Sequence, residues 1–125
     1  MVPSTILTKW DNVRRLYKLL ESGLVLVVWW GTPCTSFSKA RKWDSLGPPP
    51  LRTPAFPDGL PELSIRDQLK VDIGNQLADY SARGMEISYM SGTASVLENP
   101  GYSYIWQRVR LQQACKMIDS VTVYF

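Results

Sequence analysis

Two side chains in this sequence have the chemistry of a reactive site, the thiol of Cys34 and the carboxyl group of Glu98. Cys34 lies in the string GTPCTSFS at residues 31–38, directly after an apolar run and shortly before Lys39 and Arg41. Exposure and nearby positive charge both favour the thiolate, which is the nucleophilic form of cysteine. Glu98 lies in the string LENP, after a second apolar run. We therefore expect a nucleophile and an acid on two loops that each follow a strand.

Each of these residues also has an interpretation without chemistry. A single cysteine is usually a small buried hydrophobic side chain, and this alternative stays open for Cys34. A glutamate at a strand end is often solvated, and the Asn99-Pro100 pair after Glu98 is also a plain turn signal. The second cysteine, Cys115, falls in the middle of a predicted helix, and we interpret it as structural.

The elements that position these residues follow from hydrophobic periodicity. Apolar residues at helical spacing, ended by Gly23, predict a first helix, and a continuous β-branched and aromatic run predicts a buried strand after it. Ser64 is the predicted N-cap of the second helix and Gly84 its predicted stop. The predicted helices are residues 8–22, 64–83 and 103–117, and the predicted strands are residues 24–30, 93–97 and 120–125.

This order of elements predicts one partial α/β domain over residues 1–125. Strands separated by helices run parallel, with right-handed crossovers, so we expect a partial doubly wound parallel sheet of about three strands with flanking helices. A proline-rich loop at residues 41–61 interrupts the order, and loops of this length are usually functional lids or linkers. The sheet has two open edges, and the apolar strand at 120–125 predicts that the isolated chain self-associates.

The topology brings the two reactive residues to one place. Ligands of an open parallel sheet bind beyond the carboxyl ends of its strands. Cys34 and Glu98 both follow such ends, so they emerge at the same edge if their strands are neighbours. The sequence therefore predicts a crevice with a thiol and a carboxylate on its walls.

Composition excludes several other kinds of site. The chain has no histidine, so His-dependent triads and His-ligated zinc or haem sites are impossible within it. Two cysteines are too few for a disulfide scaffold or a Cys-only metal centre. No apolar run reaches the roughly 20 residues of a membrane span, and no signal peptide is visible. We therefore expect a cytoplasmic or nuclear protein that is not secreted.

Positive charge gathers around the proline-rich loop. The chain carries 14 basic and 11 acidic residues, a net charge of +3. Lys39, Arg41, Lys42 and Arg52 lie in or beside the loop. Such a cluster can contact phosphates, and it can also be a solvated surface. The cluster therefore predicts either a polyanionic partner or a solvated surface.

Two motifs resemble the cytosine-5 DNA methyltransferase family, in its divergent phage- or mobile-element-like members. The family's nucleophile motif has Pro-Cys, a polar residue, then Phe-Ser and a small residue, and residues 33–40 here read PCTSFSKA. The second motif of the family is Glu-Asn-Val at the end of the next strand, and residues 98–100 here read ENP. The resemblance covers the organisation of residues 20–125 and implies a partial Rossmann-like methyltransferase fold.

The resemblance implies methylation of cytosine in DNA, dependent on S-adenosylmethionine, on a base that is flipped out of the duplex. Cys34 would be the nucleophile on carbon 6 of the ring, and Glu98 would hold ring nitrogen 3. The loop from Thr35 to Pro61 would close over the base. The residues placed to contact the sugar-phosphate backbone would be Ser36, Ser38, Arg41 and Lys42.

The chain departs from the family pattern where the cofactor should bind. The glycine-bearing turn that approaches S-adenosylmethionine in the family has no counterpart before residue 8. The Gln-x-Arg-x-Arg motif is missing from its usual place, and residues 107–110, QRVR, fall inside a predicted helix, where we interpret them as its surface. We therefore expect a catalytic half whose cofactor-binding half comes from the same gene or from a partner chain or subunit.

Two alternative functions stay open. The chain can be a non-catalytic nucleic-acid-binding or interaction remnant of the same fold. The string LVLVVWWGTPC at residues 24–34 also resembles, superficially, a thioredoxin active site, where an apolar strand leads into Trp-Cys-Gly-Pro-Cys. This resemblance implies a monothiol redox domain. The first cysteine of that motif is missing here.

Overall fold

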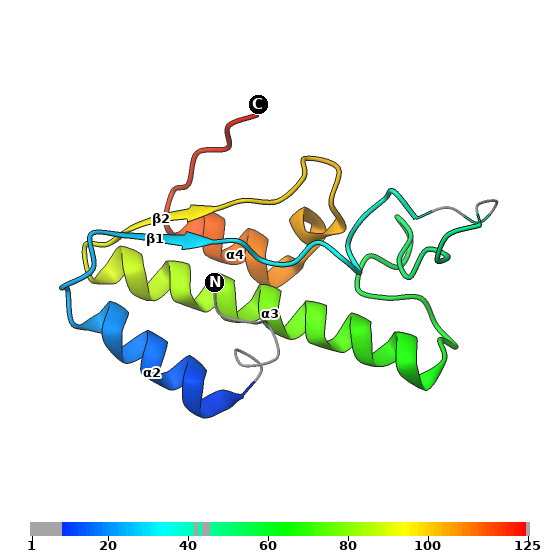
Figure 1. Cartoon of the computed structure of the whole chain (residues 1–125). Coiled ribbons are helices and arrows are strands. Elements are labelled where there is room, and N and C mark those ends of the chain that lie inside the picture. Colours follow the sequence, from blue (N-terminus) through cyan, green and yellow to red (C-terminus); the bar gives the residue numbers. More distant parts are fainter. Residues whose placement is uncertain (1–8, 42, 44–45, 125) are drawn as a thin grey trace.

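The computed structural model describes residues 9–41, 43 and 46–124. In Figure 1 the long helix α3 runs beneath a small sheet, and α2 lies along α3 on the side away from the strands. In chain order the elements are α2 (Trp10–Glu21), β1 (Val27–Trp30), α3 (Ile65–Met90), β2 (Ala94–Leu97), the 3-10 helix η1 (Tyr104–Gln107) and α4 (Val109–Met117).

The strands β1 and β2 form a parallel sheet, as the sequence predicted. Val27 pairs with Ala94 at one end of the ladder, and Trp30 pairs with Leu97 at the other. The indole of Trp30 is buried against α3, whereas Trp29 on the opposite face is 61% exposed. The fold class is therefore α/β, with helices packed on one face of a two-stranded parallel sheet.

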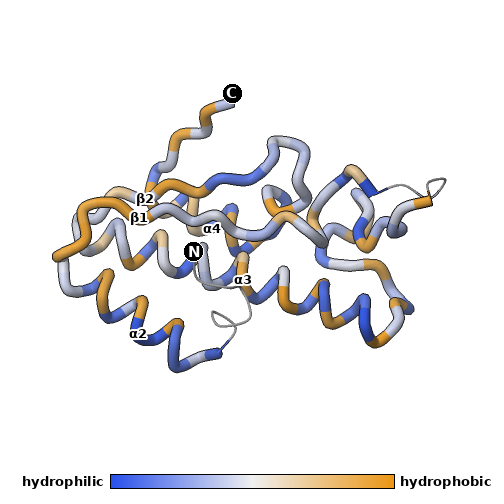
Figure 2. Tube along the Cα trace, in the orientation of Figure 1, coloured by the Kyte–Doolittle hydropathy of each residue, from blue (hydrophilic) through white to orange (hydrophobic). Residues whose placement is uncertain are grey.

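The predicted third strand at residues 120–125 is not found in the described part of the chain. Residues 120–124 leave the end of α4 and run away from the sheet (Figure 1), and Phe125 lies outside the described residues. Figure 2 shows apolar residues along this segment, and Val121 is 86% exposed. A run of β-branched residues makes a strand only where a neighbouring strand supplies hydrogen bonds and packing. The prediction of about three strands is therefore not confirmed.

The helix α3 is longer than the sequence predicted. Ser64 is its N-cap, as expected, and its hydroxyl accepts a hydrogen bond from the backbone of Asp67. The predicted stop at Gly84 is wrong, because the helix continues to Met90 and the chain turns at Gly92, where φ is +74°. Gly84 serves packing instead, since the Trp30 ring occupies the place where its Cβ would stand.

The core lies between α3 and the elements on either side of it. The apolar stripe of α2, which periodicity predicted, is buried at Val13, Tyr17 and Leu20. Tyr17 also donates a hydrogen bond of 2.8 Å to the backbone carbonyl of Tyr80 on α3. Burial of its hydroxyl, together with the neighbouring Tyr80, raises the pKa of Tyr17 well above its ordinary value.

The predicted helix at residues 103–117 divides into η1 and α4 at Arg108. The guanidinium of Arg108 donates to both carboxylate oxygens of Asp79 on α3, at 2.6 and 2.7 Å, and to Asp58 at 2.9 Å. Arg110 makes a similar two-bond contact with Glu86, at 2.6 and 2.7 Å. Residues 107–110 lie partly at the surface, as expected, and their two arginines also attach α4 to α3.

The ion pair of Glu86 predicts an acid-sensitive fold. The hydrogen bonds from Arg110, aided by Arg83, hold the pKa of Glu86 below its ordinary value of 4.5. The unfolded chain therefore takes up this proton at a higher pH than the folded chain. The contribution of the pair is complete above about pH 4.5 and is lost as the pH falls through the folded pKa. Melting temperatures measured from about pH 6 to pH 3 should fall more steeply for the wild type than for Glu86→Gln.

The control for this measurement is Glu21→Gln. Glu21 is an exposed carboxyl at the end of α2, and it makes no ion pair among the described residues. This variant should keep the pH dependence of the wild type. Equal slopes for the wild type and Glu86→Gln would contradict the assignment.

Candidate functional site

The two strands deliver their following loops to one edge of the sheet. Trp30 and Leu97 are paired at the carboxyl ends of β1 and β2, and the backbone N–H of Glu98 donates to the Trp30 carbonyl at 3.1 Å. Figure 1 shows the segments after β1 and β2 leaving the sheet in the same direction. The predicted convergence of the two strand ends is thus present, with Glu98 at the edge itself and Cys34 four residues beyond it.

Cys34 lies in a turn and is half-buried. Its backbone carbonyl accepts a hydrogen bond of 2.9 Å from Phe37, which closes a tight turn over residues 34–37. No helix begins at this turn, and the chain stays without helix or strand among the described residues up to Ser64. The thiol is therefore neither sealed in the core nor placed at a helix N-terminus.

Glu98 lies on the open side of the sheet. Its carboxylate oxygen Oε2 accepts a hydrogen bond of 3.1 Å from Nε1 of Trp29, and both residues are exposed. The next residue, Asn99, donates from Nδ2 to the carbonyl of Thr32 at 2.7 Å. The Thr32 hydroxyl in turn shares a hydrogen bond of 2.7 Å with Ser81 on α3. These bonds tie the loop after β2 to the loop after β1 and fix the carboxylate near the strand ends.

Ser36, expected at a phosphate, has a different partner. It is only 4% exposed, and its hydroxyl accepts a hydrogen bond of 2.9 Å from Arg52. Gly74 of α3 makes room for this contact, because a Cβ there would lie 2.5 Å from the Ser36 hydroxyl. The hydroxyl is therefore occupied within the protein, and Ser36 helps to hold the loop.

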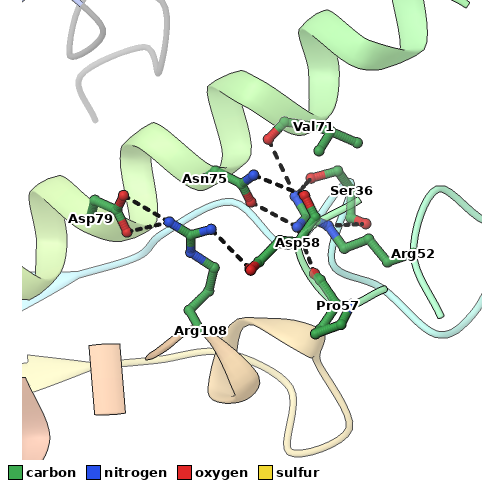
Figure 3. A network of polar contacts seen from close by, with 8 residues as sticks. All are labelled: Ser36, Arg52, Pro57, Asp58, Val71, Asn75, Asp79 and Arg108. Carbon is green, nitrogen blue, oxygen red and sulfur yellow. Dashed lines mark hydrogen bonds and ion pairs between the residues drawn. The ribbon is translucent and has the colours of Figure 1, made fainter. Parts of the chain in front are cut away.

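Arg52 is the centre of a buried network rather than part of a solvated basic cluster. It is 1% exposed, and its guanidinium plane stacks on Phe37 with Cζ 3.7 Å from the ring centroid. Figure 3 shows its five hydrogen bonds converging from the loop and from α3. The acceptors are the carbonyl and hydroxyl of Ser36, the carbonyls of Pro57 and Val71, and Oδ1 of Asn75, at 2.7–3.3 Å.

Burial of the Arg52 charge has a measurable consequence. The loss of solvation lowers the pKa of Arg52 to about 10, with the nearby positive charge of Arg108 acting in the same direction. The charge is retained at neutral pH because all five N–H groups have acceptors. Arg52 thus joins the proline-rich loop to α3, and Asn75 of α3 adds a hydrogen bond of 3.0 Å to the Asp58 carbonyl. The described residues of the loop carry no helix or strand, as predicted.

The remaining predicted contact residues lie on the outer side of this loop. The Ser38 hydroxyl accepts a hydrogen bond of 3.1 Å from the backbone of Ala40. Arg41 donates to the carbonyls of Thr35 and Pro49, at 3.2 Å each, and is partly exposed. Lys42 lies outside the described residues.

A cavity of about 190 Å³ opens between this part of the loop and η1. Lys39 stands at its wall, with Nζ 4.8 Å from the ring centroid of Tyr104. The structure thus gathers Ser38 and Arg41, two of the residues expected at a phosphate, around one hollow. The lining residues are Ser38, Lys39, Arg41, Trp43, Pro50, Arg52, Thr53, Pro54 and Tyr104.

Sequence reasoning missed the residues that organise the loop. Arg52 was placed with the solvated cations, and Asn75 and Arg108 had no assigned role. The available signal was the single arginine in a proline-rich, otherwise apolar stretch, PPPLRTP, which suggests a side chain surrounded by carbonyl groups. Trp43 was likewise not considered as a ligand contact.

No family model, curated protein or solved structure matches the chain. Among the described residues, no group of three or more His, Cys, Asp or Glu side chains could hold a metal ion. None of the helices in that part of the chain combines the length and apolar character of a membrane span. The function therefore has to follow from the residues and geometry of the chain itself.

Proposed function

We propose that this chain is the catalytic half of a DNA (cytosine-5-)-methyltransferase-like protein with a partial Rossmann-like fold. Cys34 is the nucleophile on carbon 6 of cytosine, and Glu98 holds ring nitrogen 3. The observation that carries the proposal is the pairing of β1 and β2 as parallel neighbours, since it brings the PC and EN motifs to one edge of the sheet. This edge is where an open parallel sheet binds its ligands.

The residues suit addition of a thiolate to the pyrimidine ring. A bond forms between the Cys34 sulfur and carbon 6, and the electron pair of the 5,6 double bond moves to carbon 5 and the ring. A proton shared between Glu98 and nitrogen 3 stabilises the charge that develops. The hydrogen bond from Trp29 positions the carboxylate through Oε2, which leaves Oε1 for the base. The base has to be unstacked before it can meet either group.

The described residues do not fit S-adenosylmethionine. Cofactor binding of this kind needs a glycine at a strand end that lets the backbone approach the ligand closely. Among the described residues no strand precedes β1, so the earlier strand and its glycine-bearing turn are not found there. We propose that a partner chain or a further segment binds the cofactor.

The test uses a reaction that needs no cofactor. After the thiolate adds to carbon 6, carbon 5 takes a proton from water and loses its original hydrogen when the S–C6 bond breaks. DNA labelled with tritium at carbon 5 of cytosine should therefore release tritium to water. We expect Cys34→Ser to abolish the release, Glu98→Gln to slow it about 100-fold, and Cys115→Ser to leave it unchanged. Release that survives Cys34→Ser, or none from the wild type, would contradict catalysis by this chain.

A second function is favoured by the hollow beside the loop. Cations and aromatic rings that line one cavity are typical of nucleic-acid-binding surfaces, and binding there requires no chemistry at Cys34. A non-catalytic nucleic-acid-binding remnant would bind DNA in a salt-dependent way, with equal affinity in Cys34→Ala and Glu98→Gln. The thioredoxin-like alternative has less support, because no helix begins at Cys34 to stabilise a thiolate.

A further inference from the structure

We propose that the cavity lined by Lys39, Arg41, Trp43, Thr53 and Tyr104 binds one phosphate of an unpaired nucleic-acid strand, with a neighbouring base stacked on Trp43. This inference deepens the proposed function, on which it rests for the class of ligand. The inference adds that the bound nucleic acid is unpaired, either as a single strand or as a nucleotide extruded from a duplex. It also names the residues that bind it.

The size and charge of the cavity suit a phosphate group. Its volume of about 190 Å³ leaves room for a phosphate group. Lys39 is exposed at the wall, and Arg41 is partly exposed beside it. Arg41 is held in place by the carbonyls of Thr35 and Pro49. The site is thus preorganised by the loop, and it presents two positive charges together with the Thr53 hydroxyl.

Trp43 supplies the second contact. Its side chain is 70% exposed at the rim of the same cavity. Exposed aromatic rings beside cations are the arrangement by which proteins bind single strands, because every base has a face that can stack and the backbone follows the charges. A phosphate within the cavity would place the adjoining base outside it, at the rim where Trp43 lies.

The geometry favours an unpaired strand over a duplex. The bases of a duplex are stacked on each other, so none offers a face to Trp43 unless it leaves the helix. The cavity also differs from a second hollow of the same volume, about 190 Å³, on α2. There Arg14, Arg15 and Lys18 line the hollow, together with the acidic Asp11. That surface can attract DNA through its charge, but no aromatic ring lines it.

The test is binding of a fluorescently labelled 12-nucleotide oligothymidylate to the full chain, measured by anisotropy at several salt concentrations. We expect Trp43→Leu to weaken binding by about tenfold or more, the range for loss of one stacked base. The double variant Lys39→Gln/Arg41→Gln should weaken binding and reduce its salt dependence. The single variant Lys39→Gln should act in the same direction, and it spares the contacts that Arg41 makes within the loop.

The matched control is Arg14→Gln/Arg15→Gln, which also removes two positive charges, in this case from α2. It should change the affinity less than twofold. A hairpin duplex should bind more weakly than the single strand and without dependence on Trp43. Equal losses from the two double variants, or tight duplex binding that ignores Trp43, would overturn the inference.

This measurement is separate from the catalytic test. If tritium release fails while Trp43-dependent binding persists, the catalytic proposal is wrong and this site stands. If release depends on Cys34 while Trp43→Leu binds normally, the catalytic proposal stands and this site is wrong.

Discussion

Replacing Arg52 by methionine should lower the free energy of unfolding by about 3 kcal/mol or more. The substitution keeps much of the volume and removes five hydrogen-bond donors from a site that is 1% exposed. The acceptors of Ser36, Pro57 and Asn75 then lose this partner, and each buried acceptor left without a donor costs about 1–3 kcal/mol. Part of this loss is offset, because methionine carries no charge that has to be buried. For arginine this burial is unfavourable, and it lowers the pKa of Arg52 to about 10.

The measurement is urea denaturation followed by circular dichroism, and the control is Arg66→Met. Arg66 is an exposed arginine near the start of α3, so its replacement should change stability by less than about 0.5 kcal/mol. Limited proteolysis gives a second readout. In Arg52→Met the loop at residues 46–61 should be cut before the helices, because it loses the hydrogen bonds that Arg52 makes to α3. Equal stability of the two variants would mean that solvent reaches the Arg52 site in the folded protein.

The failure to predict this network has a physical reason. Arginine is rarely buried, so its presence near Lys39 and Arg41 made a solvated cluster the natural interpretation. What buries Arg52 is a set of neutral acceptors from two distant segments, the loop and α3, brought together by the close approach that Gly74 allows. The local stretch PPPLRTP could indicate an arginine among carbonyl groups, but it could not identify the acceptors that α3 contributes.

The fold was predictable wherever one local rule sufficed. The apolar stripe of α2 and the cap at Ser64 each follow from a few adjacent residues, and both are confirmed. The end of α3 was mispredicted because Gly84 obeys a packing constraint from Trp30, 54 positions earlier in the chain. The third strand failed for a related reason, since a strand needs a partner and residues 120–124 have none in the described part of the chain.

In the candidate site, too, the features set by local sequence were predictable and those set by tertiary contacts were not. The order of strand, helix and strand was enough to place Cys34 and Glu98 after neighbouring strand ends. Which side chains face a ligand was not predictable, because exposure depends on tertiary contacts. Ser36 is turned inward to Arg52, whereas Ser38, two residues later, lines the cavity.

Replacing Gly84 by alanine should destabilise the fold by about 2 kcal/mol, although alanine is the better helix former. The intrinsic preference for alanine within a helix is about 1 kcal/mol in its favour. The added Cβ would overlap Cη2 and Cζ2 of the Trp30 ring, and overpacking of a core costs about 1–3 kcal/mol and occasionally more. The ring has little freedom to move, because its Nε1 donates to the Ser95 hydroxyl at 2.9 Å. The clash therefore outweighs the gain in helix propensity.

A double-mutant cycle isolates the contact. Gly84→Ala should cost less in a Trp30→Phe background, because the smaller ring lacks the outer atoms that clash. Gly31→Ala is the matched control, since no atom lies within 4 Å of its added Cβ, and it should change stability by less than about 0.5 kcal/mol. The measurement is the free energy of unfolding from urea titration. If the changes caused by Gly84→Ala and Trp30→Phe are strictly additive, the cost of alanine at position 84 does not arise from the Trp30 ring. Coupling between them would establish that this glycine sets the distance between α3 and β1, the strand that leads to Cys34.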